Sequence, residues 1–321
     1  MQILVYHPRQ TGDVIIGSHC ARLLKKKHPD ATIIFVTDKR LVPLIEPCPW
    51  LDVVVDEPEF EPKEILKPED KHKRYMHWEW NDLLNVRAFE KMVNDWKPDL
   101  AYKPRWNPME KPIPYKAPYM FRCYAHCCGL TQEEANDTAY SLPLDENERD
   151  VAEGIWNHHT QFTRLALHMD HLDPSFLALV DRYGALVLDT SGKVSLRENL
   201  AILAQADCVV TRYGGVAVMA ASVDTPTVMV PKPEPSTWAS PEFSHPNCGH
   251  IVVKPIRTCN AYEATDEHRL QPCQPQYGEY FEDRCVLGLK GRDDVADGFH
   301  CWRSVKVEDL YPHIELRLEY T

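Results

Sequence analysis

The first 38 residues decide the fold of this chain, and they read MQILVYHPRQTGDVIIGSHCARLLKKKHPDATIIFVTD (residues 1–38). Two short runs of aliphatic and β-branched residues, Ile3–Tyr6 and Thr32–Val36, have the length and composition of buried β-strands. Between them, Ser18–Lys27 has the composition of a helix with basic residues in its last turn. A strand, a helix and a second strand in this order predict a parallel βαβ unit.

The segment GDVIIG (Gly12–Gly17) lies where the first strand passes into the helix, and it carries an acid at Asp13. Turns of this kind usually face a ligand in α/β proteins. A phosphate would be repelled by a carboxylate and is bound instead by glycines and free backbone N–H groups. GDVIIG is therefore not a dinucleotide-binding fingerprint. Asp13 either caps its helix or serves another chemistry.

The alternation of strands and helices continues along the chain and restarts after a polar stretch at Ser141–Glu148. Recurring prolines between Lys103 and Pro118 predict a long loop. We therefore expect two parallel α/β domains, residues 1–150 and residues 151–321. The further predicted strands are Val53–Val55, Leu100–Tyr102, Arg164–His168, Leu186–Leu188, Cys208–Thr211 and Thr227–Val230, and the further predicted helices are Lys39–Ile45, Asp82–Trp96, Ser175–Tyr183, Leu196–Ala206 and Val216–Val223.

The composition is ordinary for a globular protein: 321 residues, 44% hydrophobic and 26% charged. The net charge of −12 is shared by two acidic halves, which argues against extensive contact with nucleic acid. Basic patches at Arg22–Lys27 and Lys71–Arg74 are interpreted as solvated helix faces. No apolar run approaches the ~20 residues of a membrane span and the start lacks a signal-peptide pattern, so we expect a cytoplasmic protein.

The 11 cysteines are interpreted as thiols, because nothing in the sequence indicates export. Four of them lie in a Gly-, Pro- and charge-rich stretch, where a structural zinc site that cross-links the chain is the alternative. Their gaps include no C-x2-C, so free thiols are favoured and no metal is predicted. These four are Cys259, Cys273, Cys285 and Cys301.

The strand Cys208–Thr211 runs into Arg212-Tyr213-Gly214-Gly215 and then into a helix. Paired glycines allow the backbone to approach a ligand closely, and the free N–H groups of a helix N-terminus favour an anion. Arg212 could add a positive charge. These are parts of a pyrophosphate site, and the alternative is a tight turn before a packed crossover helix.

Three stretches carry a family resemblance: GDVIIGSHC…LDVVV (residues 12–55), the strand ending in His168, and DTSGKVSL…TPTVMV (residues 189–230). In amino-acid sequence and in their order along the chain, they resemble the heptosyltransferase-like glycosyltransferases of family 9, which have the GT-B fold. The resemblance covers residues 1–56 and 163–256. It implies two Rossmann-like domains that face each other across a cleft, with the acceptor held by the first and a nucleotide-sugar by the second.

The resemblance also gives Asp13 a role. It is similar in place to the family aspartate that acts as general base on the acceptor hydroxyl, in an inverting transfer that needs no metal. The implied co-substrate is a nucleotide-diphosphate sugar, and no other cofactor is expected.

The donor-binding positions of the family can be compared with this sequence one residue at a time. The segment GKVSL looks like the family loop that holds the nucleotide base, and Tyr213-Gly214-Gly215 occupies the turn where the family has Asp-Ser-Gly or Asp-Thr-Gly. Val218 stands where the family commonly has a histidine, and no lysine follows His168, so His168 and His171 are candidates to substitute for it. The predicted donor-binding residues are His168, Gly192, Lys193, Val194, Ser195, Arg212, Tyr213, Gly214 and Gly215.

Residues 57–135 match no family, and this region should build the acceptor side of the cleft. We predict an acceptor-side site of Gly12, Trp78, Trp80 and Trp106, on which an acceptor could stack, with a core or lid role for the tryptophans as the alternative.

The favoured function is a monomeric glycosyltransferase that acts on a glycan or another hydroxyl acceptor, with peripheral contact to a membrane if the acceptor is membrane-bound. The alternatives are a sugar-nucleotide epimerase of similar architecture and a non-catalytic nucleotide- or sugar-binding protein.

Overall fold

The computed structural model describes residues 1–8, 10–60, 77–104, 120–131, 133–137, 139–159, 163–169, 174–189, 191–212, 214–230, 251–253 and 305–319. Several predicted site residues lie outside the described residues, and the predictions made for them stay predictions. They are Trp106, His171, Tyr213, the four cysteines Cys259, Cys273, Cys285 and Cys301, and the side chains of Trp78 and Trp80.

The first unit is built on a four-stranded sheet of order β3-β2-β1-β4, in which every pairing is parallel. Parallel pairing follows from the helices that cross from one strand to the next. Its strands are β1 (Gln2–Tyr6), β2 (Thr32–Thr37), β3 (Val53–Asp56) and β4 (Leu100–Tyr102); its helices are α1 (Thr11–Lys27), α2 (Val42–Ile45), α4 (His77–Trp96), α5 (Met120–Cys127) and the 3₁₀ turn η2 (Glu134–Asn136).

The second unit is built on a five-stranded sheet of order β6-β5-β7-β8-β9, again with parallel pairings. Its strands are β5 (Leu165–Leu167), β6 (Leu186–Val187), β7 (Cys208–Arg212), β8 (Thr227–Val230) and β9 (Ile251–Val252); its helices are α6 (Glu146–His159), η3 (Pro174–Leu177), α7 (Ala178–Tyr183), α8 (Leu196–Ala204), α9 (Gly215–Ala221) and α13 (Val307–Leu318).

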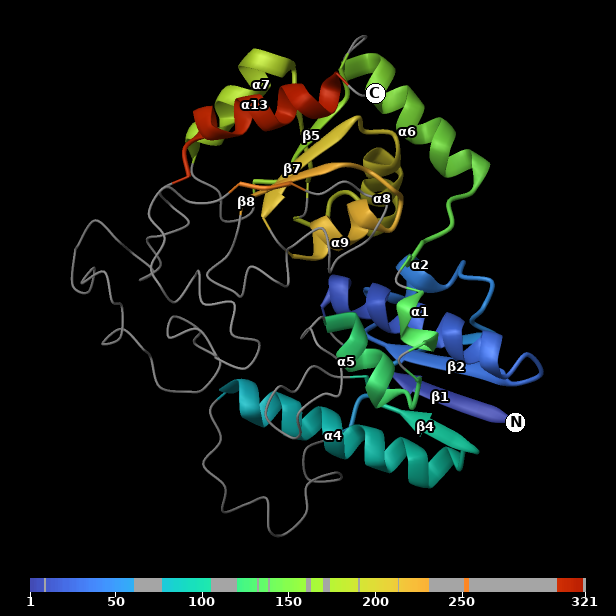
Figure 1. Cartoon of the computed structure of the whole chain (residues 1–321). Helices are drawn as coiled ribbons and strands as arrows, with labels where there is room; N and C mark the ends of the chain where they lie inside the picture. Colours follow the sequence, from blue (N-terminus) through green and yellow to red (C-terminus); the bar gives the residue numbers. More distant parts are fainter. Residues whose placement is uncertain are drawn as a thin grey trace, which may run out of the picture.

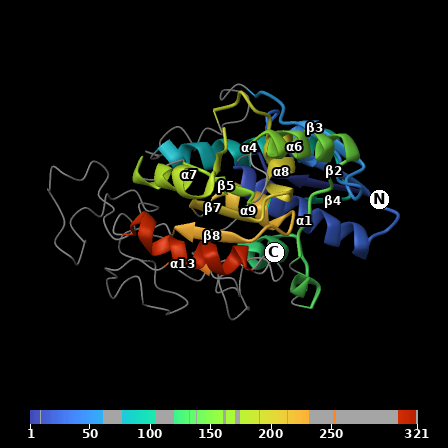
Figure 2. The same ribbon diagram turned by 90° about the horizontal axis from the view of Figure 1, so that it is seen from above.

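The helices and sheets form layers that Figure 1 shows from bottom to top: α4, the first sheet, α1 with α2, then α8 with α9, the second sheet, and α7 with α13. One apolar cluster runs through the helices between the sheets, from Phe35 of β2 to Val209 of β7. Separate clusters lie under α4 and under α13. Seen from above, α7 and α13 lie on the side away from the N-terminus (Figure 2). The two units therefore meet through helices that pack against one another.

The predicted parallel α/β architecture is confirmed, and β8 has the predicted bounds. Helix α1 begins earlier than predicted, at Thr11, so Gly12 and Asp13 lie in its first turn. Helix α6 was not predicted, because its polar start resembles a linker; it buries Trp156, whose indole N–H donates to the Ile202 carbonyl at 3.1 Å. The predicted division at residue 150 falls inside α6.

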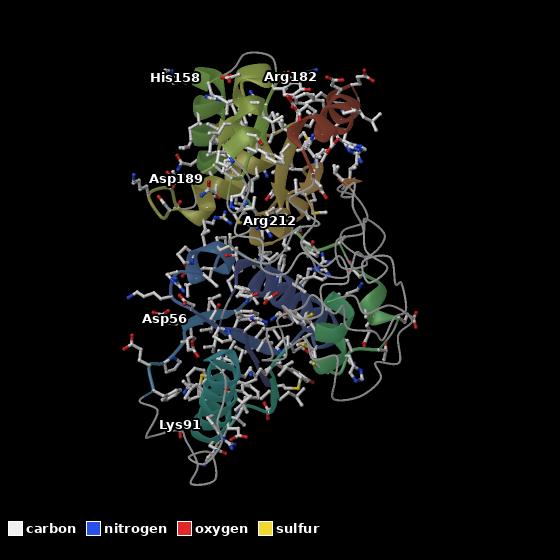
Figure 3. All side chains as sticks on the ribbon, turned by 90° about the vertical axis from the view of Figure 1, so that its left-hand side faces the viewer. Asp56, Lys91, His158, Arg182, Asp189 and Arg212 are labelled. Atoms are coloured by element: carbon white, nitrogen blue, oxygen red, sulfur yellow. The ribbon has the colours of Figure 1, made fainter. Side chains whose placement is uncertain are left out.

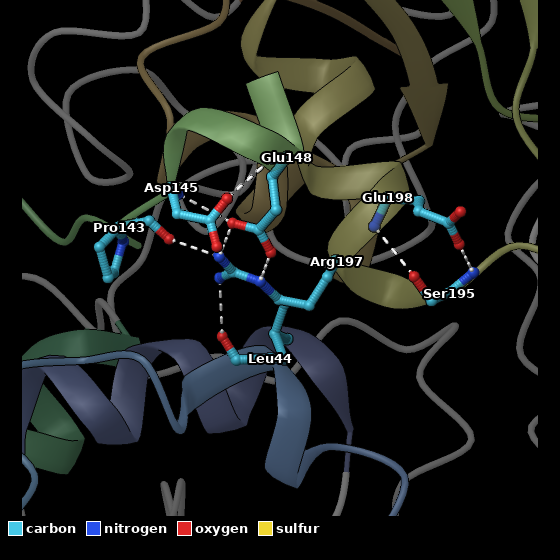
Figure 4. Close-up of polar contacts among 7 residues, drawn as sticks. All are labelled: Leu44, Pro143, Asp145, Glu148, Ser195, Arg197 and Glu198. Carbon is cyan, nitrogen blue, oxygen red and sulfur yellow. Dashed lines mark hydrogen bonds and ion pairs between the residues drawn. The ribbon is translucent and has the colours of Figure 1, made fainter. Parts of the chain in front are cut away.

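Arg197, the second residue of α8, joins four segments of the chain (Figure 4). Its Nε donates to Glu148 Oε1 of α6 at 2.6 Å, and a second bond joins its guanidinium to Glu148 Oε2. Further bonds reach the carbonyls of Pro143 at 2.8 Å and of Leu44, in α2 of the first unit, at 3.4 Å. The side chain is nearly buried, so these bonds replace its lost hydration. Arg197 thus fixes where the chain crosses between the units.

We expect Glu148→Gln to lower the free energy of unfolding at pH 7 by about 3 kcal/mol, because it removes the partner of a buried guanidinium. Hydrogen bonds from Arg197 hold the pKa of the Glu148 carboxyl below its usual value of 4.5. A carboxyl with a lowered folded-state pKa contributes stability above its unfolded pKa and loses it as the pH falls. Wild-type stability should therefore decline from about pH 5 downward more steeply than that of Glu148→Gln.

Urea unfolding from acid to neutral pH measures both effects. Glu146→Gln, an exposed acid in the same first turn of α6, is the matched control and should change little. Equal stability of the Glu148 and Glu146 variants at pH 7 would contradict the role given to the Arg197 contacts.

Candidate functional site

In the second sheet, the direction in which successive strands are added reverses at β5. Strand β6 pairs with one edge of β5 and β7 with the other, so the topological switch point lies between β5 and β7. Ligands of open α/β sheets bind outside the carboxyl ends of the strands at such a point. His168 directly follows β5, and Thr211 and Arg212 end β7. The predicted donor residues His168 and Arg212 therefore share one edge of the sheet.

His168 is held at this edge by Thr211. Its backbone N–H donates to the Val210 carbonyl at 2.9 Å, and its ring Nδ1 lies 2.9 Å from Thr211 Oγ1. The Thr211 hydroxyl donates to the Arg212 carbonyl at 3.1 Å, so it accepts a hydrogen bond from an Nδ1–H of His168. This network assigns the proton to Nδ1 and fixes the orientation of the ring. Sequence reasoning missed Thr211, which the switch-point rule would have indicated.

Arg212 is the last residue of β7, and it pairs with Val230. Its side chain is buried, and Figure 3 shows it at the edge of the second unit that faces the first. Gly214 follows as the cap residue of α9, with an extended backbone that other residues also adopt. Arg212 therefore lies at the carboxyl edge of the second sheet, and its role toward a donor stays a prediction.

The start of α1 faces this edge from the first unit. The cap residue of α1 is Gln10, whose φ of 66° is in the left-handed range and whose side chain makes no capping hydrogen bond. Asp13 is therefore the third residue of α1 and not its cap. Its side chain is half-buried.

Two glycines let α1 and α9 touch across the junction of the units. A Cβ built on Gly215 would lie 3.0 Å from Thr11 Cβ, and one built on Gly12 would lie 3.1 Å from Val218 Cγ2. Both distances are shorter than ordinary carbon contacts. Gly215 therefore has a packing role whatever ligand it meets. Val218 packs against Gly12 at the position where the family resemblance leads one to look for a histidine.

The direction of Asp13 follows from the neighbours of these glycines. Around the axis of α1, Asp13 is about 100° from Gly12, which faces α9, and about 40° from Gly17. Gly17 faces the first sheet, with Phe35 Cζ at 3.4 Å from the position of a Cβ. Asp13 therefore lies between the stripe that packs on the sheet and the stripe that packs on α9. Asp13 therefore lies in the same first turn of α1 that contacts Gly215 of α9 through Thr11 and Gly12.

The loop before α8 holds the other predicted donor residues. Gly192 has a φ of 92°, a conformation that favours glycine, and Lys193 is exposed. The Ser195 hydroxyl accepts a hydrogen bond from Glu198 N–H at 3.1 Å, and Glu198 Oε2 accepts one from Ser195 N–H at 2.8 Å. This capping box gives Ser195 a structural role at the start of α8, and the role of Ser195 in donor binding stays a prediction.

Asp189 orders the start of the same loop and was not singled out from the sequence. Its carboxylate accepts a hydrogen bond from Ser191 N–H at 2.8 Å, and bonds from Ser191 lower the pKa of the Asp189 carboxyl. The Asp189 carbonyl accepts a bond from Asn199 Nδ2 at 3.0 Å. The loop thus leaves β6 at the same carboxyl edge as His168.

The five described cysteines are thiols, as predicted: Cys20, Cys48, Cys127, Cys128 and Cys208. Burial raises the pKa of Cys48 and that of Cys208 to about 12, so neither is a nucleophile at neutral pH. Among the described residues, no group of three or more His, Cys, Asp or Glu side chains could hold a metal ion. In the same part of the chain, no helix has both the length and the apolarity to cross a bilayer.

We expect Gly215→Ala to lower the free energy of unfolding by about 1–3 kcal/mol, because its methyl group would be forced against Thr11. Gly154→Ala is the matched control: it also lies inside a helix, but a Cβ there meets nothing within 4 Å, so it should raise stability by about 0.5–1 kcal/mol. Denaturant unfolding compares the two. Adding Thr11→Gly should recover part of the loss, and a Gly215→Ala protein as stable as wild type would contradict the close contact.

No family model matches the sequence, and no curated protein matches it. Solved structures do match. A family 9 glycosyl transferase from Veillonella parvula is similar over 100% of this chain and 97% of its own, with a TM-score of 0.61 and 15% identity. The ADP-heptose LPS heptosyltransferase II of E. coli is similar over 100% of this chain and 99% of its own, with a TM-score of 0.60 and 14% identity.

A third structure is the heptosyltransferase TibC in complex with ADP-D-β-D-heptose. It is similar over 99% of this chain and 76% of its own, with a TM-score of 0.56 and 12% identity. At these identities the similarity shows the fold, and the predicted GT-B architecture is confirmed.

Proposed function

We propose that this protein is an inverting glycosyltransferase that moves a sugar from a nucleotide-diphosphate donor to a hydroxyl acceptor without a catalytic metal. The observation that carries the proposal is the meeting of α1 and α9. Thr11, two residues before Asp13, contacts Gly215, three residues after Arg212. This contact supports the proposal, because it brings the segments that carry Asp13 and Arg212 from opposite units to one junction.

Asp13 is the proposed general base. The acceptor oxygen attacks the anomeric carbon, and its proton passes to the Asp13 carboxylate as the new C–O bond forms. A carboxylate is a weak base toward a sugar hydroxyl, so the proton moves late, when the oxygen has become acidic. Asp13 therefore stabilises the transition state and contributes little to binding either substrate.

The donor is proposed to lie on the second unit. The bond from the anomeric carbon to the diphosphate oxygen breaks, its electron pair leaves with the diphosphate, and Arg212 stabilises the charge that develops there. His168 and the Gly192–Ser195 loop border the same sheet edge and are proposed to contact the donor. Base and leaving group approach the sugar from opposite sides, which is the arrangement that inversion requires.

We expect Asp13→Asn to keep the fold and the donor affinity and to lose on the order of a hundredfold to ten-thousandfold in turnover. Asn is nearly isosteric but cannot accept the proton. Thermal melts, donor titration and single-turnover transfer of both proteins are the measurements. Full activity of the Asn variant would refute the base assignment, and a collapse in melting temperature would mean that Asp13 is structural.

A thermal-shift panel of nucleoside diphosphates identifies the donor class. A ligand at one hundred times its dissociation constant should stabilise the fold by about 2.7 kcal/mol, so the correct base should stand out. The matching nucleotide-sugar is then tested for turnover. Release of nucleoside diphosphate only with an acceptor supports transfer, an acceptor-free change of the sugar would mean an epimerase, and binding without either would mean a binding protein.

A further inference from the structure

His7 lies on the face of the first sheet that α1 covers. It directly follows β1, and its backbone N–H donates to the Val36 carbonyl at 2.9 Å. Side chains alternate along a strand, and Ile3 and Val5 belong to the apolar cluster on the α1 face, so His7 continues that face. A Cβ built on Gly17 of α1 would lie 3.6 Å from His7 Cβ and 3.7 Å from His7 Cδ2. The imidazole therefore lies directly against Gly17.

Asp13 is one helical turn above Gly17 on the same side of α1. Residues four apart in a helix lie one above the other, about 5–6 Å apart between their Cβ atoms. The end of α1 that carries Asp13 is also the end that lies over the carboxyl edge of β1. His7, which lies against Gly17, is thus one helical turn from the position of Asp13 on the same side of α1.

The ring of His7 has little freedom. It is 9% exposed, and it packs against Tyr124 of α5 in a tilted arrangement, with ring centroids 5.3 Å apart and planes inclined by 39°. Tyr124 is itself 2% exposed. A ring packed between Gly17 and Tyr124 presents its nitrogens in a fixed direction. A carboxylate that must meet a hydroxyl proton benefits from such a fixed neighbour, because small misplacements in a reacting site cost large factors in rate.

From this arrangement we infer that His7 is a positioning residue for Asp13: a ring N–H donates to one carboxylate oxygen and leaves the other directed at the acceptor hydroxyl. The inference rests on the proposed function for its catalytic meaning, but the contact between the two side chains can be tested without activity. His7 touches neither substrate, and its effect passes through Asp13.

The first test is substitution of His7. His7→Leu keeps the bulk and removes both ring nitrogens, so we expect single-turnover transfer to fall by about tenfold to a hundredfold with unchanged donor affinity. His7→Asn and His7→Gln place an amide N–H near Nδ1 and Nε2 respectively, and one of them should restore most of the rate. His19→Leu is the matched control, because His19 is a buried histidine of α1 itself whose ring bonds to the Asp137 carbonyl; it should leave the rate of the folded protein nearly unchanged.

The second test combines the changes. In an Asp13→Asn background, His7→Leu should reduce turnover by less than about twofold, because residues that act as one unit are not additive. Full turnover of His7→Leu, no recovery by either amide variant, or an equal loss with and without Asp13 would each overturn the inference. If His7→Leu does not fold, the transfer rates of His7→Asn and His7→Gln decide instead. A higher rate for one of the two supports the inference, and equal rates overturn it.

A third measurement separates this inference from the proposed function. Urea midpoints of wild type, His7→Asn, Asp13→Asn and the double variant report whether the two side chains interact, whatever the protein catalyses. Non-additive midpoint shifts support the contact and additive ones overturn it. A wild-type protein that transfers no sugar while the midpoints are non-additive would refute the function and leave the contact standing.

Discussion

The close approach of α1 and α9 is the constraint on which the rest of the structure depends. At Gly12 and Gly215 the two helices meet so closely that an added Cβ would lie 3.1 Å and 3.0 Å from the facing side-chain carbons. The helices that touch here are also the ones that each sheet packs against, so this contact sets the separation of the two sheets. The apolar cluster is continuous across this contact, so the interface between the units is packed like a protein interior. A single added methyl group there lowers the stability of the folded protein.

A nearly buried ion pair accompanies this apolar contact. Arg197 donates two hydrogen bonds to the Glu148 carboxylate and two more to backbone carbonyls. Buried pairs of this kind contribute little net stability compared with apolar residues, but breaking one leaves a charge without a partner. The pair therefore specifies the path of the chain between the units more than it adds to the free energy of folding.

The same constraint explains why polar side chains collect at the junction. In each parallel sheet the carboxyl ends of the strands lie at one edge, and the first turns of the following helices lie beside them. Because α1 and α9 touch at those turns, the segments that carry Asp13 and Arg212 come from opposite units to the same junction. The proposed transfer uses this opposition, since the base and the leaving group must lie on opposite sides of the reacting carbon.

The sequence by itself determined strands β1 to β8, the parallel α/β class and the resemblance to GT-B glycosyltransferases, because short β-branched runs and turn residues are local signals; it did not indicate β9. Asp13 and Arg212 could be singled out for the same reason. Helix α6 and the contacts of Arg197 could not, because a polar start and a single arginine look like solvent-exposed positions until their partners are placed. Only the tertiary structure decided that Gly12 and Gly215 are needed for packing and that His7 lies against Gly17. Those relations join residues far apart in the sequence, and they arise only when helices from different segments pack on the same sheet edge.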